Sequence, residues 1–135
     1  MDIQDLKTAK EQKVSLLLKD CKVFFAFSNQ QFEENKTPLE EGEKYVSIGA
    51  GGYMPKSQKE NFNNGMDLIH NWYKGETKNN KLRKENILYE LNNHEAFYTM
   101  SIDTTLEVLG SEYTRKEVFS VYSRELKKLI KADKI

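Results

Sequence analysis

The chain has 135 residues, of which 38% are hydrophobic and 31% charged, a balance typical of one globular domain rather than a disordered chain. Basic and acidic residues both number 21, and this zero net charge argues against a bulk electrostatic grip on DNA or RNA. The single cysteine, Cys21, excludes an internal disulfide and favours a cytoplasmic protein. No run approaches the roughly 20 apolar residues that cross a bilayer, so we expect no membrane contact.

Helices and short strands are expected to alternate in the first part of the chain. A loose apolar stripe predicts a helix over residues 5–19, and the aromatic run at 22–27 is typical of a strand. Ser28 followed by Gln31 fits a capping box, which predicts a short helix through residue 34. Residues 37–40 repeat that pattern with proline at the first helical position and predict one further helical turn.

The middle of the chain holds a second strand and the strongest helical pattern. Residues 45–48 predict a strand, which the glycine-rich segment 49–52 interrupts as a bulge or turn before Pro55 ends it. Apolar residues from Phe62 to Tyr73 recur at spacings of three and four and predict a helix. The polar stretch at 76–81 is either a break or only an exposed turn, and residues 82–91 are again expected to be helical.

The last third should be mainly helical. Residues 95–99 are expected to be extended, whereas 103–109 predict a short helix with Gly110 as its C-terminal stop. Thr114 and Glu117 form a capping box, which begins a final helix. We therefore expect an α+β fold over residues 1–135, a single domain with a small antiparallel sheet and several helices, two of them long.

Flat rings and bare backbone lie close together in the first part of the sequence. The run of Val23–Phe27 ends in Ser28-Asn29, and the second strand ends in the Gly49-Ala50-Gly51-Gly52 segment. Aromatic rings can stack on a base, and glycine backbone can approach a phosphate. A core strand and a structural bulge explain the same residues equally well, so this pattern leaves both interpretations open.

The densest polar cluster is Asn92-Asn93-His94-Glu95, at the expected end of a helix. Asparagine can read the edge of a base, and His94 with Glu95 could orient a ligand hydroxyl. The alternative is a helix C-terminus closed by polar side chains. A metal site is not expected, because zinc needs three or four ligands at recognisable spacings. A nucleophilic Cys21 would need an activating partner that the sequence does not indicate.

Three blocks of the sequence resemble a family of small phage and prophage proteins. They are FFAFSNQQF at 24–32, IGAGG at 48–52 and YELNNHE at 89–95, and their order and spacing are similar to those of the first-described Thoeris anti-defence family. Those proteins are sponges for the cyclic ADP-ribose isomers that bacterial TIR enzymes make. The resemblance covers roughly residues 22–126. It implies a homodimer or higher homo-oligomer that forms through helices, in the cytoplasm of an infected bacterium, and that binds the nucleotide without catalysis, cofactor or metal.

The resemblance also implies which residues form the ligand pocket. They come from all three blocks, and none is expected to be catalytic: Phe24, Phe27, Ser28, Asn29, Gly51, Gly52, Asn92, Asn93, His94 and Glu95. Two alternatives remain. The protein could be an enzyme that acts on a cyclic nucleotide with His94 as acid or base. It could also inhibit a host defence protein through a face that carries Trp72 and Tyr73.

Overall fold

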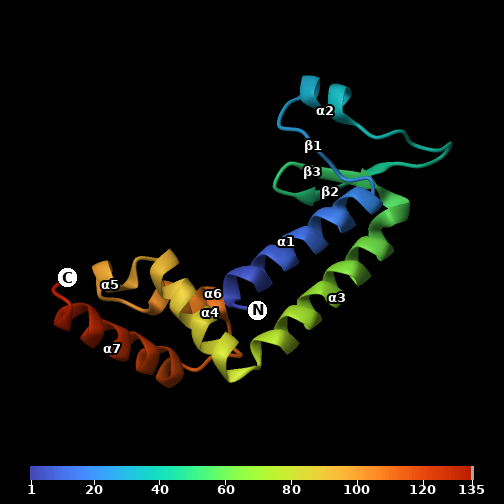
Figure 1. The fold of residues 1–135 in the computed structure, drawn as a ribbon. Coiled ribbons are helices and arrows are strands. Elements are labelled where there is room, and N and C mark those ends of the chain that lie inside the picture. Colours follow the sequence, from blue (N-terminus) through green and yellow to red (C-terminus); the bar gives the residue numbers. More distant parts are fainter. Residues whose placement is uncertain (135) are drawn as a thin grey trace. The chain divides into compact units, whose positions relative to one another are not determined.

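A computed structural model describes residues 1–134 (Figure 1). Its contacts divide the chain into two compact units, one of residues 5–74 and one of residues 1–4 together with the chain from Gly75 onward. We call them the sheet unit and the helical unit. The α+β class, with one small antiparallel sheet and several helices, is confirmed.

The sheet unit holds every strand of the described residues and the two longest helices. Its elements are α1 (Ile3–Asp20), β1 (Phe24–Phe25), α2 (Asn29–Asn35), β2 (Tyr45–Gly49), β3 (Gly52–Pro55), a 3₁₀ turn η1 (Lys56–Gln58) and α3 (Lys59–Thr77). The division between the units falls just inside α1 and near the end of α3. In Figure 1, α1 and α3 run side by side in opposite directions, and lysines of α1 contact Trp72 and Tyr73 of α3.

Three antiparallel strands form the sheet in the order β1-β3-β2. On one face, the rings of Phe24, Tyr45 and Tyr53 pack with Phe32 of α2, with ring centroids 5.1 to 5.7 Å apart. Edge-to-face and stacked pairs at such distances contribute about 0.5–1.5 kcal/mol each beyond area burial. The aromatic strand pattern therefore supplies the small core that holds α2 on the sheet.

Two expectations for this unit need adjustment. The first strand is confirmed but spans only two residues, Phe24 and Phe25. The helical turn predicted at 37–40 is wrong, because this segment has no regular structure. The Thr37 hydroxyl donates to the Lys22 carbonyl (3.0 Å), and the Tyr45 hydroxyl donates to the Thr37 carbonyl. These bonds hold Thr37 between Lys22, which precedes β1, and Tyr45, the first residue of β2.

The helical unit contains four helices in addition to the end of α3. They are α4 (Asn80–Asn93), α5 (Ala96–Thr99), α6 (Asp103–Leu109) and α7 (Arg115–Lys131). Ile87 and Leu91 of α4 and Val118 of α7 are fully enclosed in its core, where the rings of Phe97 and Tyr122 stack at 5.2 Å. Helical periodicity in α4 and α7 therefore produced the expected apolar faces.

The helix ends in this unit follow the expected capping chemistry, with one exception. The Thr114 hydroxyl accepts the Glu117 N–H (3.1 Å) as the capping box predicts, and Gly110 ends α6 with a positive φ. The extended segment predicted at 95–99 is wrong, because it forms the one-turn helix α5. Glu95 takes left-handed backbone (φ +53°) and its carbonyl accepts N–H groups from Tyr98 and Thr99.

Candidate functional site

The two phenylalanines expected in the site have opposite surroundings. Residues along the first strand alternate, so that Phe24 and Ala26 are buried while Phe25 and Phe27 are exposed. The Phe24 ring is 6% exposed and belongs to the aromatic cluster under α2. The Phe27 ring is 76% exposed. Phe27 is thus the member of the predicted pair that a dissolved ligand can reach.

Ser28 and Asn29 lie at the start of α2, directly after Phe27. The Ser28 hydroxyl accepts the Gln31 N–H at 3.1 Å, and the Gln31 side chain in turn accepts the Phe27 N–H at 2.8 Å. The Ser28 cap is therefore present, but the predicted reciprocal bond of a capping box is not, because Gln31 accepts the N–H of Phe27 rather than that of Ser28. Both bonds fix the backbone beneath the Phe27 ring. Asn29 is exposed at the first position of the helix.

The glycine-rich segment forms a two-residue hairpin turn between β2 and β3. Gly49 and Gly52 pair across the strands, and the two residues between them, Ala50 and Gly51, both have positive φ (+50° and +78°). A type I′ turn requires such a pair of angles, and it matches the twist of the strands. Of the two alternatives left open by the sequence, the turn is what the chain forms, with a register shift just before it.

Two glycines of this hairpin, Gly51 and Gly52, are covered by aromatic and aliphatic side chains. A Cβ at Gly51 would lie 2.4 Å from the Phe27 ring, and one at Gly52 would lie 2.7 Å from Ile48 and 3.1 Å from the Phe25 ring. The absence of side chains at these positions therefore lets the rings lie on the strand backbone. The sequence had suggested that this bare backbone meets phosphate, whereas here it meets phenylalanine.

Together these side chains form a surface that we call the hairpin platform: Phe25, Phe27 and Ile48 over Gly51 and Gly52. The sequence analysis missed Phe25, which is 43% exposed, and Ile48. The sequence could have indicated Phe25, because residues 25 and 27 are two positions apart and must share a face of a strand. The strand beneath the rings is fixed, since Asn35 donates to the Phe25 carbonyl (2.8 Å) and the Ala26 N–H donates to the Gly51 carbonyl (2.9 Å).

The third predicted segment lies in the helical unit, at the end of α4. Asn92 and Asn93 are exposed, and the chain leaves the helix through His94 as the cap residue and Glu95 in left-handed conformation. His94 is oriented inward, and its Nε2 lies 3.2 Å from a carboxylate oxygen of the buried Glu90. The first two segments thus meet in the sheet unit, whereas the third belongs to the other unit.

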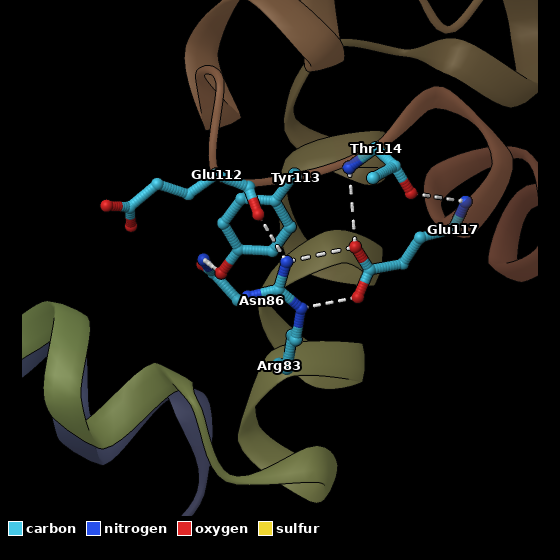
Figure 2. A network of polar contacts seen from close by, with 6 residues as sticks. All are labelled: Arg83, Asn86, Glu112, Tyr113, Thr114 and Glu117. Atoms are coloured by element: carbon cyan, nitrogen blue, oxygen red, sulfur yellow. Dashed lines mark hydrogen bonds and ion pairs between the residues drawn. The ribbon is translucent and has the colours of Figure 1, made fainter.

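A separate polar network joins α4 to the start of α7 (Figure 2). The Arg83 guanidinium donates through Nε and Nη2 to the Glu117 carboxylate and through Nη2 to the Glu112 carbonyl (2.6 Å), and it lies 4.0 Å from the centroid of the Tyr113 ring. The Asn86 amide donates to the Tyr113 hydroxyl at 2.9 Å. Hydrogen bonds from Arg83 lower the pKa of Glu117 below its usual range.

This network is built for structure rather than for chemistry on a ligand. The Arg83 side chain is only 23% exposed because it is engaged on the carboxylate, the carbonyl and the ring. Glu117 additionally closes the capping box with Thr114. Both charges are therefore committed within the fold, and we call this group the Arg83 clamp.

Residues 6–131 match a family described as a family of unknown function, DUF7659. The chain belongs to this family. The match extends over α2, the hairpin platform, the Asn92–Glu95 segment and the Arg83 clamp, so all of these features lie in the part of the chain that defines DUF7659. No curated protein and no solved structure matches the chain.

Among the described residues of this DUF7659 protein, no cluster of three potential metal ligands occurs. Cys21 is buried, and this burial, together with the neighbouring Asp20, raises the pKa of its thiol. A raised pKa keeps the thiol protonated and weakly nucleophilic near neutral pH. Within residues 1–134, no helix is both long and apolar enough to span a bilayer.

Proposed function

We propose that this protein binds a nucleotide and releases it chemically unchanged, with the hairpin platform as the surface on which the base stacks. The observation that carries this proposal is a pair of exposed phenylalanines, 43% and 76% accessible, in and just after β1, whose rings lie next to the glycines of the paired β2–β3 hairpin. Large apolar rings exposed together are typical of a binding surface. The backbone that carries these rings is already ordered, so binding a ligand would not cost the conformational entropy of ordering it.

Two features indicate the class of ligand: the exposed aromatic rings of the platform and the polar residues that follow Phe27. A stacked base gains about 1–3 kcal/mol on an aromatic side chain. Asn29 and the polar start of α2 follow Phe27 directly and can hydrogen-bond a sugar or phosphate. The resemblance to the Thoeris anti-defence proteins makes a cyclic ADP-ribose isomer, in the bacterial cytoplasm, the first ligand to test.

Isothermal titration calorimetry with purified cyclic ADP-ribose isomers tests this proposal. We expect binding by the unmodified protein and a roughly 5- to 150-fold loss of affinity for Phe27→Ala, which corresponds to one lost stacking contact. Phe119→Ala is the matched control, because Phe119 is also a half-exposed phenylalanine (55%) but lies on α7. Equal affinity of the Phe27 variant and the parent protein would remove the platform from the site.

A second measurement separates a sponge from an enzyme. After overnight incubation and denaturation, chromatography should return the starting nucleotide at its full amount. A new product would instead support catalysis on the cyclic nucleotide, with His94 as the first residue to replace. If no nucleotide binds at all, a host protein becomes the better candidate partner.

The Asn92–Glu95 segment can be tested in the same titration. Asn92 is exposed and lies at the end of a helix, so Asn92→Ala should fold normally. If Asn92 contacts the nucleotide, the variant should bind at least about tenfold more weakly, the effect of one lost hydrogen bond to a charged or polar group. Unchanged affinity would remove Asn92 from the site.

A further inference from the structure

The two segments that build the sheet contain no charged residue. They are residues 23–32, which hold β1 and the start of α2, and residues 45–55, which hold β2, the hairpin turn and β3. Neither segment contains a histidine, although 31% of the whole chain is charged. All residues of the hairpin platform belong to these two segments, so the platform lies on a neutral part of the sheet unit.

The lysines that flank these segments lie at the end of the sheet opposite the hairpin turn. Lys22 precedes the first segment, and Lys44 and Lys56 flank the second, all three with exposed side chains. The Lys56 N–H donates to the Lys44 carbonyl (2.8 Å), which continues the pairing of β2 with β3 away from the turn. Lys56 is four residues from Gly52, or about 13 Å along an extended strand. Exposed charges at this separation are largely screened, because the Debye length is about 8 Å at physiological ionic strength.

The charges that follow the platform along the chain are carboxylates. Glu33 and Glu34 are exposed near the end of α2, and Glu33 pairs with Lys36 at 2.6 Å. A phosphate beside α2 would therefore meet negative charge, or a lysine that already has a partner. The Asn29 amide, in contrast, can both donate to and accept from an uncharged hydroxyl group.

We propose that the hairpin platform recognises the uncharged nucleoside part of its ligand, with the base on the phenylalanine rings and the phosphates in solvent. This inference rests on the proposed function and specifies which part of the nucleotide is bound. A base stacks through its π-face, which requires no charge on the protein, and a ribose hydroxyl suits the Asn29 amide. Removal of the phosphates should therefore leave most of the affinity in place.

NMR titrations of the ¹⁵N-labelled full chain with adenosine, AMP and ADP test this proposal, because they also measure weak binding. We expect the three dissociation constants to agree within about threefold, since no cation of the platform holds a phosphate. Each should change less than about twofold between roughly 50 and 300 mM sodium chloride. If ADP binds at least about tenfold more tightly than adenosine and loses this advantage in high salt, a cation holds its phosphates and the proposal is overturned.

Three lysine variants test the same point on the protein. Lys22→Gln, Lys44→Gln and Lys56→Gln each remove an exposed charge that flanks the sheet, and each should leave the affinity for ADP unchanged. Phe27→Ala should weaken adenosine and ADP by the same factor, whereas the control Phe119→Ala should weaken neither. A lysine variant that loses affinity for ADP but not for adenosine would contradict the proposal.

A cyclic ADP-ribose isomer in the same titration separates this inference from the proposed function. If the isomer binds and Phe27→Ala weakens its binding, but adenosine does not bind, the proposed function stands and the nucleoside inference fails. If neither the isomer nor any member of the adenosine series binds, both are overturned.

Discussion

The Arg83 clamp should stabilise the helical unit more than an ordinary surface ion pair does. The perturbation is a double-mutant cycle of Arg83→Met, which retains an apolar stem over Tyr113, and Glu117→Gln, which retains a side chain able to close the capping box. The cycle isolates the interaction between the two charged groups because the other effects of each substitution cancel.

The expected coupling follows from the geometry. Hydrogen bonds to charged groups contribute about 1.5–3 kcal/mol when they are buried, and exposed pairs about 0.2–1 kcal/mol. The two side chains here are 23% and 30% exposed, and the contact is bidentate, so we expect a coupling of roughly 1.5–2 kcal/mol. Urea unfolding of the four proteins at neutral pH, followed by circular dichroism, measures it.

The chain contains a matched control for this cycle. Arg115 and Asp103 form an ion pair of 2.7 Å at the same end of α7, but their side chains are 68% and 70% exposed. Their coupling should stay below about 0.5 kcal/mol. If Arg83 and Glu117 couple no more strongly than this exposed pair, partial burial adds nothing and the reasoning fails.

Three further predictions concern acid stability and the hairpin. Because the folded state lowers the pKa of Glu117, its carboxylate stabilises the protein above the unfolded pKa of 4.5, and this contribution is lost as the pH falls further. Urea unfolding at a series of pH values should show the loss in the parent protein. The Glu117→Gln variant should not show it. Ala50→Asn should raise the free energy of unfolding by about 0.5–1 kcal/mol, because asparagine tolerates the left-handed backbone that strains alanine. Gly51→Ala should cost about 1–2 kcal/mol and more than Gly49→Ala, since both have positive φ but a Cβ at Gly49 meets open space. Equal costs at the two glycines would show that the Phe27 ring does not press on the turn.

Local chemistry made most of the helices predictable. The apolar spacing from Phe62 to Tyr73 and the capping box at Thr114 each depend on residues within a few positions of one another, so the sequence contains the whole signal. The two predictions at 37–40 and 95–99 were wrong because these segments take their conformation from features that the local sequence pattern does not indicate. The first segment is held by bonds to Lys22 and Tyr45, and the second turns because Glu95 accepts a strained conformation.

The candidate site was predictable only in part, because its residues have two physical explanations that the sequence does not distinguish. Alternation along the strand requires that Phe24 and Phe27 point to opposite faces, but only the position of α2 decides that Phe24 is the buried one. The residues of the first and second blocks do meet, as expected. Strand pairing between β1 and β3 brings them together.

The hairpin glycines give the sharpest connection between fold and proposed function. If their role were to approach phosphate, their backbone would have to face solvent, yet Gly52 is buried beneath Phe25 and Ile48. If the platform binds a base, we therefore expect these glycines to act indirectly, by letting the Phe25 and Phe27 rings lie against the strand backbone. An alanine at Gly51 would tilt the Phe27 ring without removing it, so a platform that binds by stacking should lose affinity even though every ring remains in place.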